Sequence, residues 1–216
     1  MKQLTNKQKR NLYLFFYYLL SWTWGIIMSS IGLVVMLVLA PFGKVYFDRG
    51  RFYGVVGKNW GGLELGCFYI LCEQSNLNRR THAHEGFGHS LQNCILGPLF
   101  PFVVAIPSAV RYWVFNQRDY KGRQNFVLSL FTGFNVLSIL SLIIPIWTEV
   151  TALYWIPALI FVYGVLIFNW LWRIELPKWI EAPYPQYDDV WFEGTATGWG
   201  LRLMDWYDKM SRGEDD

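Results

Sequence analysis

Residues 81–92 read Thr81-His82-Ala83-His84-Glu85-Gly86-Phe87-Gly88-His89-Ser90-Leu91-Gln92. The chain of 216 residues has three histidines, and all of them lie in this segment beside a glutamate. Imidazole nitrogens and a carboxylate form a ligand set that suits zinc. The segment therefore predicts a metal-site helix, and the rest of the chain is organised around it.

The spacing of the histidines differs from the common zinc-hydrolase motif His-Glu-x-x-His, in which the histidines are four residues apart. His84 and His89 are five apart, so on a regular α-helix they would diverge by roughly 140°. A one-residue π-bulge would realign them, and Gly86 and Gly88 make the backbone permissive enough for it. In this arrangement His84 and His89 are metal ligands and Glu85 is the catalytic carboxylate.

Two other arrangements remain open. On a regular helix His82, Glu85 and His89 would share one face, which makes His82 a further candidate for the site. Alternatively, the histidines would act only as capping and hydrogen-bonding groups of an interfacial helix. Gln92 follows His89 by one turn and is a candidate for orienting a ligand or a substrate.

The composition indicates an integral membrane protein, with the lipid bilayer as its main partner. Hydrophobic residues make up 53% and charged residues only 16%, against about 25% charged in an ordinary soluble domain. The net charge of +3 is modest and the basic residues form no stripe, so no nucleic-acid partner is expected. The three cysteines are an odd number without framework spacing, which argues against disulfides.

The pattern along the chain predicts a mainly α-helical membrane protein of five segments. These are 1–43, an N-terminal transmembrane helix; 44–80, a small antiparallel sheet and loop; 81–125, the metal-site helix and a proline-broken interfacial segment; 126–172, a transmembrane hairpin; and 173–216, a tail with a helix. The apolar run 12–42 can cross a bilayer once but not twice. Its Trp22-Thr23-Trp24-Gly25 cluster indicates an interfacial belt or a break.

The middle segments differ in residue composition. Residues 44–71 alternate β-branched and aromatic pieces with turn sequences, which predicts an antiparallel sheet of two or three strands. Residues 95–115 are apolar but contain three prolines, so we expect a re-entrant or interfacial segment. The runs 126–147 and 153–172 are long enough to span, and their short link predicts an antiparallel hairpin.

The tail begins with a proline-rich segment, 173–186, which predicts an extended connector. Asp188 and Asp189 then favour a helix start, and the helix should cover 190–210. Glu193 lies among aromatic residues, where an unpaired carboxylate would be costly. It either favours the helix N-terminus or serves as a third metal ligand.

The distribution of basic residues predicts the orientation. Of the 19 lysines and arginines, four precede the first apolar run, six lie in 44–80, four in 111–123 and five after 172, while the hairpin link has none. The positive-inside rule places the link outside and the candidate site on the cytoplasmic side of a cell membrane. One full crossing by 12–42 would put the four N-terminal charges outside, a conflict that a re-entrant first segment would remove.

The order of these segments resembles the membrane-embedded gluzincin peptidases, the group of the heat-shock membrane endopeptidase and the CAAX prenyl protease. In that group a His-Glu-x-x-His helix precedes a transmembrane hairpin and a helix with Glu-x-x-Ala-Asp. Here Glu193-Gly194-Thr195-Ala196-Thr197 keeps the Glu and the Ala, and threonine replaces the Asp. The block 84–94 with Leu96-Gly97-Pro98 and Ile106-Pro107-Ser108 also resembles a group of bacterial membrane proteins.

The resemblance implies a zinc-dependent membrane metallopeptidase in which His84, His89 and Glu193 hold the metal. It also implies that Glu85 is the general base and that Thr197 partly replaces the missing Asp as acceptor for a ligand imidazole. Peptidases of this kind often bind extended substrates by strand addition, so the substrate would be a peptide or a membrane protein. The alternative function is a non-catalytic membrane protein in which a metal or polar cluster staples the C-terminal helix to the histidine helix.

Overall fold

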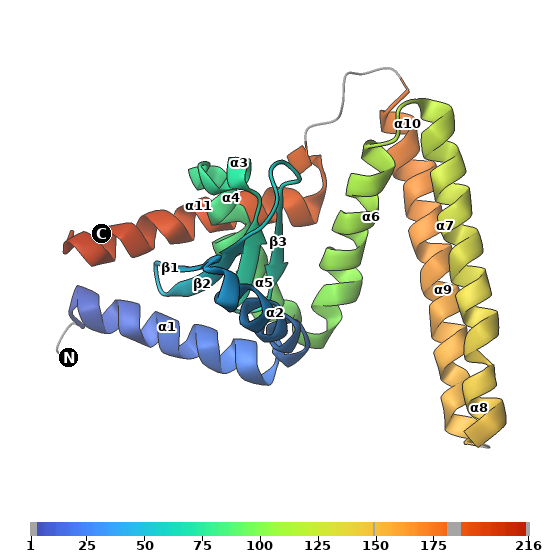
Figure 1. Cartoon of the computed structure of the whole chain (residues 1–216), viewed down its shortest axis with the longest axis horizontal. Helices are drawn as coiled ribbons and strands as arrows, with labels where there is room; N and C mark the ends of the chain where they lie inside the picture. Colours follow the sequence, from blue (N-terminus) through green and yellow to red (C-terminus); the bar gives the residue numbers. More distant parts are fainter. Residues whose placement is uncertain (1–3, 149, 181–186, 215–216) are drawn as a thin grey trace. The chain divides into compact units, whose positions relative to one another are not determined.

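The computed structural model describes residues 4–148, 150–180 and 187–214 (Figure 1). The chain is mostly helical, with one four-stranded sheet. It forms two compact units, which are described separately below. The first contains the described residues up to Ala105 together with those from Tyr187 onward, and the second contains the described residues from Ile106 to 180.

The first unit begins with two helices, α1 (Asn6–Thr23) and α2 (Ile26–Leu39), followed by the short turn η1 (Ala40–Phe42). Thr5 caps α1 in a capping box with Gln8. The axis turns by 97° between the two helices. The break falls at Gly25, where a Cβ atom would lie 2.6 Å from the Asn93 amide nitrogen. The predicted N-terminal helix is therefore two helices, divided within the Trp22–Gly25 cluster.

The sheet follows, and its strands are β1 (Val45–Asp48), β2 (Arg51–Val55), β3 (Gly62–Leu65) and β4 (Phe68–Leu71). Their order is β1-β2-β4-β3, and the central pair β2/β4 is parallel while the outer pairs are antiparallel. The prediction of an antiparallel sheet of two or three strands was thus wrong. The loop after β2 uses Gly57 and Gly61 at positive φ, and it carries the chain to the far edge before β4 returns to the middle.

The histidine segment leaves the sheet through α3 (Glu73–Asn76) and α4 (Arg79–Ala83), continues as the π-helical segment η2 (His84–His89), and ends with α5 (Ser90–Leu96). Two short turns, η3 (Gly97–Leu99) and η4 (Pro101–Ala105), complete this part of the unit. The predicted π-bulge is confirmed, and it covers both histidines and the glycines between them. Proline residues interrupt regular helix after α5 as expected.

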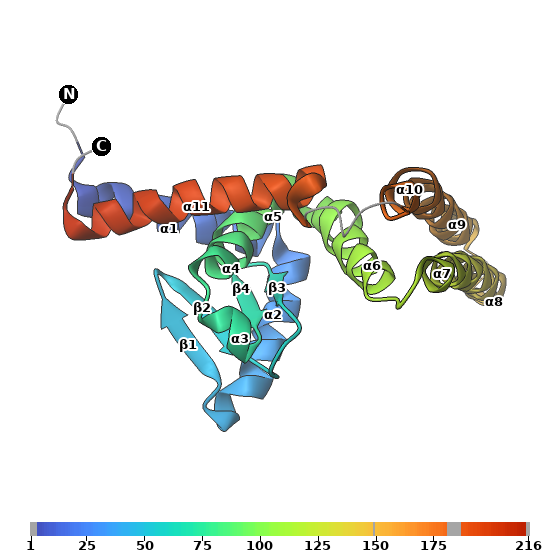
Figure 2. The same cartoon turned by 90° about the horizontal axis from the view of Figure 1, so that it is seen from above.

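The C-terminal helix α11 (Trp191–Arg212) crosses η2 at backbone contact. Figure 2 shows α11 running across the histidine segment, with the sheet to one side. A Cβ atom on Gly88 would overlap the carbonyl oxygen of Ala196, and one on Gly200 would overlap that of Ala83. The two glycines therefore allow the close crossing that brings residues of α11 to the histidines.

We expect Gly88→Ala to destabilise the first unit by about 1–3 kcal/mol or more, because an added methyl group must push the two helices apart. Gly198→Ala is the matched control, since a Cβ there has no neighbour within 4 Å and alanine favours the helix by up to about 1 kcal/mol. Thermal unfolding in detergent, followed by circular dichroism, measures both. Equal melting temperatures for the two variants would contradict the close crossing.

The second unit is a helical bundle. It contains α6 (Ile106–Phe115), α7 (Tyr120–Ser141), α8 (Ile143–Thr148), η5 (Thr151–Tyr154), α9 (Trp155–Trp170), η6 (Leu171–Glu175) and α10 (Leu176–Lys178). The stretches Tyr120–Thr148 and Trp155–Lys178 are long and apolar enough to cross a membrane, with mean hydropathy 2.2 and 1.7. They correspond to the predicted hairpin. The second stretch stays helical to Lys178, so the start of the predicted extended connector was wrong, and its residues 181–186 lie outside the described part.

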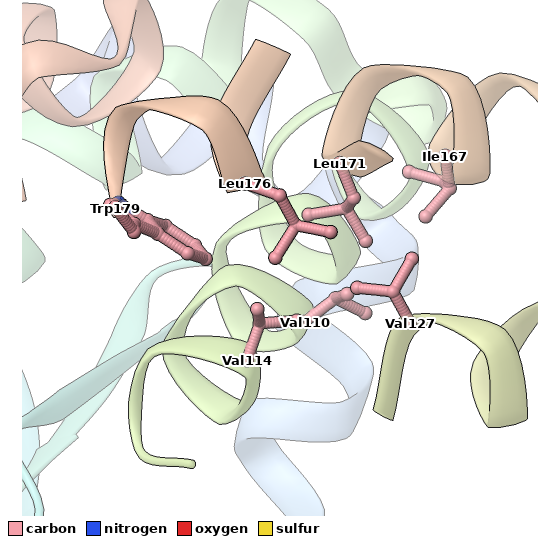
Figure 3. Packing of buried hydrophobic residues seen from close by; sticks show 7 residues of the cluster. All are labelled: Val110, Val114, Val127, Ile167, Leu171, Leu176 and Trp179. Carbon is pink, nitrogen blue, oxygen red and sulfur yellow. The ribbon is translucent and has the colours of Figure 1, made fainter. Parts of the chain in front are cut away.

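A cluster of buried side chains joins α6, α7, α9, η6 and α10 (Figure 3). Its members are Val110, Val114, Val127, Ile167, Leu171, Leu176 and Trp179. Beside it, the Arg111 guanidinium donates to the Glu175 carboxylate at 2.9 Å, and Lys178 reaches the same carboxylate at 2.8 Å. The buried arginine is thus paired with a carboxylate, as a charge in an apolar setting must be.

Candidate metal centre

Three buried side chains converge where α11 crosses the π-helical segment. The Nε2 atoms of His84 and His89 lie 3.1 and 3.2 Å from the same carboxylate oxygen, Oε2 of Glu193. One ligand atom from each residue lies within 4.8 Å of the other two. The exposed fractions are 6% for His84, 5% for His89 and 0% for Glu193. The geometry of this group could hold a metal ion.

The π-helical segment explains why both rings reach one point. On a regular helix the five-residue spacing would send them to different sides, whereas here the ring centroids are 4.4 Å apart. π-Helical turns are rare and are frequently found at functional sites. The local backbone therefore places His84 and His89 together.

The outer nitrogen of each ring is held by a side-chain oxygen. His89 Nδ1 lies 2.7 Å from Gln92 Oε1. The Gln92 amide nitrogen donates to the Phe192 carbonyl oxygen at 2.7 Å and to the Thr195 hydroxyl at 2.8 Å. Since the amide nitrogen is fixed in this way, its oxygen faces His89 and accepts a hydrogen bond from Nδ1. Gln92 thus orients a ligand ring, one of the two roles predicted for it.

His84 is oriented in the same manner. Its Nδ1 lies 2.8 Å from the Thr197 hydroxyl, which in turn donates to Asp188 Oδ1 at 2.9 Å. Because the hydroxyl hydrogen is directed at Asp188, the hydroxyl oxygen accepts from the His84 ring. Both imidazoles therefore carry hydrogen on Nδ1.

This tautomer decides what the centre can bind. With hydrogen on Nδ1, each ring has Nε2 left to bind a cation, and here both Nε2 atoms face one oxygen of Glu193. Nitrogen and carboxylate lone pairs that face each other repel unless a cation, either a proton or a metal ion, lies between them. Glu193 Oε1 is also buried and has no hydrogen-bond partner among the described residues. The donor set thus fits a divalent cation held by two imidazoles and a carboxylate.

The electrostatics of Glu193 agree with a charged carboxylate. Burial alone raises the pKa of Glu193, but without a bound metal the two imidazoles can also carry hydrogen on Nε2 and donate to the carboxylate, and this outweighs burial and holds the pKa well below the ordinary value. A carboxylate that stays ionised in a buried position is a competent metal ligand.

Comparisons with protein-family models, with curated proteins and with solved structures gave no match. The resemblance to membrane-embedded gluzincin peptidases therefore stays a prediction from sequence.

Glu85 lies between the metal-site group and the sheet. Its carboxylate accepts a hydrogen bond from the backbone N–H of Glu64 on β3, and it interacts electrostatically with both ligand histidines. Burial raises the pKa of Glu85, and this effect exceeds the lowering by His84 and His89. A raised pKa makes a carboxylate a stronger base, which suits a group that takes up and returns a proton.

His82 lies outside the group. Its Nδ1 is 3.0 Å from the Tyr69 hydroxyl, and its Nε2 is 3.0 Å from the Asn76 carbonyl oxygen. The ring also stacks edge-on against Tyr53 and Tyr69. His82 therefore ties α4 to the sheet, and the arrangement with His82, Glu85 and His89 on one face is not the one observed.

The sequence indicated Asp188 only as a helix-start residue, but in the structure its carboxylate is linked to His84 through the Thr197 hydroxyl. It accepts from Thr197 and also pairs with the Arg80 guanidinium. Where the resembled peptidases carry an Asp, this chain has Thr197, and its hydroxyl is linked to the carboxylate of Asp188 nine residues earlier. The threonine at the position of the missing Asp was the only feature of the sequence that pointed to this role of Asp188. A threonine hydroxyl can accept one hydrogen bond and donate another, but the sequence does not show which residue accepts the second.

We expect Thr197→Val to lower zinc affinity about 10–100-fold, the usual effect of removing a group that orients a metal-binding histidine. Asp188→Asn should act in the same direction, because it removes the charge behind the relay. Asp189→Asn, an exposed neighbour, is the control and should bind zinc as the wild type does. Competition with a fluorescent chelator measures the affinities, and equal affinity for all four proteins would exclude the relay.

Proposed function

We propose that this protein is a zinc-dependent membrane hydrolase, with peptide bonds of peptides or membrane proteins as its substrates. The observation that carries the proposal is the convergence of two imidazole Nε2 atoms on one buried carboxylate oxygen, with Nδ1 of each ring held by a side-chain oxygen. Two histidines and one glutamate leave a fourth coordination position open, the arrangement of catalytic rather than structural zinc sites.

Zinc held by these residues would act as a Lewis acid and lower the pKa of a water molecule to about 7. Within the chain, Glu85 would take a proton from the attacking water and return it to the leaving amine. Its burial beside His84 and His89 supports this role. Thr197 and Gln92 hold the ligand rings in the required tautomer.

The edge strand β3 supports a peptide as the substrate. Among the described strands β3 pairs with β4 alone, and a Cβ atom on Gly62 of this strand would lie 2.9 Å from Glu85 Oε1. An extended peptide added along an edge strand gains main-chain hydrogen bonds irrespective of its side chains. A peptide carbonyl aligned with β3 would thus be presented close to Glu85.

The proposal is tested by zinc content and proteolysis together. Detergent-purified wild-type protein, analysed by inductively coupled plasma mass spectrometry, should contain about one zinc per chain. Glu193→Gln should contain little, because a neutral amide is a poor ligand for zinc. A loosely folded membrane protein added as test substrate should be cleaved by the wild type and spared in the presence of a chelator. Wild-type protein that takes up no zinc after reconstitution would overturn the proposal.

The second candidate is a non-catalytic centre that staples α11 to the histidine segment. It is favoured by the burial of the three candidate ligands and of Glu85, each at most 6% exposed, since a hydrolytic centre must admit water and substrate and a structural one need not. The two candidates predict the same zinc content. They differ in the effect of replacing Glu85, because loss of this carboxylate lowers turnover only if the centre is catalytic.

A further inference from the structure

The first unit carries an extended apolar surface along α1 and α2. One face of α2 is packed against the sheet, through residues such as Met28, Gly32 and Met36, and the opposite face is exposed. On that face Val34, Leu37 and Val38 are each 60–63% exposed. In α1, Phe15 and Phe16 are exposed in the same way. An apolar surface of this size requires an apolar partner.

A bilayer is the partner that the rest of the molecule offers. The chain carries two helices long and apolar enough to cross a membrane, so a lipid bilayer is the apolar partner that we consider for this surface. Lys7, Lys9 and Arg10 lie at the start of α1, where their charges would meet lipid phosphates. An apolar helix face with basic residues at its polar end is typical of helices that lie in the membrane interface.

The start of α1 is fixed on the polar side of the unit. Figures 1 and 2 both show it beside the end of α11. Asn6 donates to the Glu214 carbonyl oxygen at 3.1 Å, and Arg10 donates to the Ser211 hydroxyl at 3.2 Å. The part of α11 reached by α1 carries five charged residues between Arg202 and Arg212. A helix with this charge density stays out of hydrocarbon, so the N-terminal end of α1 does as well.

The far end of α2 returns to the same body of the protein. It leads directly into β1, whose outer edge has no neighbouring strand in the described sheet. Open sheet edges are not tolerated in the hydrocarbon region, because water is absent and the backbone groups stay unpaired. The turn after β1 is held to α11 by the Arg49–Asp208 ion pair at 2.6 Å. Both ends of the α1–α2 segment are thus on the polar side of the unit.

The dimensions of the two helices agree with a shallow insertion. At 1.5 Å per residue, α1 and α2 are about 27 and 21 Å long, and each is shorter than the roughly 30 Å of hydrocarbon in a bilayer. The 97° bend prevents them from adding their lengths along one axis. The corner between them contains Trp22 and Trp24, residues enriched where membrane meets water.

We propose that α1 and α2 form a re-entrant anchor that enters one leaflet and returns, so that residue 7 and residue 44 lie on the same side as the His84/His89/Glu193 group. The anchor removes the conflict of the N-terminal charges with the positive-inside rule, because all basic segments outside the hairpin then share one side. It also holds the candidate centre next to a membrane surface. The inference does not depend on zinc or on catalysis.

Single cysteines in the full-length protein test the sidedness. The three native cysteines are buried, so the unsubstituted chain measures the background. In proteoliposomes of known orientation, Lys7→Cys and Lys44→Cys should react with an impermeant maleimide from the same side, and Val150→Cys, in the hairpin link, from the opposite side. Thr23→Cys, at the bend, should not react from the side of Val150. Labelling of the first two from opposite sides, or of Thr23→Cys from the side of Val150, would overturn the anchor.

Spin labels test what covers the apolar face. A nitroxide at Leu37→Cys should show high accessibility to oxygen, which partitions into lipid, and low accessibility to an aqueous nickel chelate. A label at Arg202→Cys, exposed on α11, is the matched control and should show the reverse. Low accessibility to both reagents at Leu37 would mean that a protein surface covers it, and high accessibility to nickel would mean water. Either result would overturn the proposal, whatever the zinc content of the sample.

Discussion

The Glu85→Gln variant is expected to lose hydrolytic turnover by about 10² or more while it keeps its metal. A positioned acid–base group usually contributes 10²–10⁴ in rate, and glutamine cannot take a proton at neutral pH. The ligands His84, His89 and Glu193 are untouched, and glutamine matches the size of glutamate. The substitution therefore separates proton transfer from metal binding.

Cleavage of the loosely folded test protein, with zinc content measured on the same sample, provides the readout. Glu73→Gln is the control, since Glu73 is exposed at the start of α3 and should leave both quantities unchanged. Equal turnover of wild type and Glu85→Gln, at equal zinc content, would remove the catalytic proposal. The stapling function would then be the better account of the centre.

His89→Ala is expected to abolish stoichiometric zinc binding and to lower stability together. Only two ligands remain after the change, and a ligand that binds the folded state stabilises it by about 4 kcal/mol when present at 1,000 times its Kd. The loss is therefore expected as a fall in melting temperature that depends on zinc concentration. Metal-binding free energy is coupled to folding in this way whether or not the centre is catalytic.

The matched control is His82→Ala, which removes a histidine from the same segment but outside the metal-site group. His82→Ala loses its hydrogen bonds to Tyr69 and Asn76, so it should be less stable than the wild type to the same extent with and without zinc. Zinc content and melting curves with and without a chelator distinguish the two variants. One zinc per chain in His89→Ala, or loss of zinc in His82→Ala, would show that the ligand assignment is wrong.

Local pattern accounted for much of the fold. The two apolar runs around a link without basic residues correspond to the stretches Tyr120–Thr148 and Trp155–Lys178. They could be predicted because the length and hydropathy of a segment decide whether it can cross a bilayer. Asp188 and Asp189 marked the start of α11 to within a residue or two. The five-residue spacing with two glycines between the histidines predicted the π-helical segment, because no regular helix aligns such a pair.

The convergence of His84, His89 and Glu193, argued from spacing, local polarity and a family resemblance, is present in the structure at 3.1 and 3.2 Å. The crossing of η2 and α11 that produces it depends on Gly88 and Gly200 meeting carbonyl groups of the facing helix. Neither glycine was interpreted in this way beforehand. The sequence does not show which backbone segment will pack against a given glycine.

Sequence by itself thus determined the two helices long and apolar enough to cross a membrane, the π-helical histidine segment and the pair His84 and His89, since these follow from composition and from spacings within one element. Glu193 was a candidate only through local polarity and a family resemblance. Tertiary structure alone decided the parallel pairing of β2 with β4, the turn between α1 and α2, the placement of His82 against Tyr69, and the relay from His84 through Thr197 to Asp188. Each of these features depends on contacts between residues of different elements. Such pairings depend on how elements pack, and local propensity carries no information about the side chain that arrives from elsewhere.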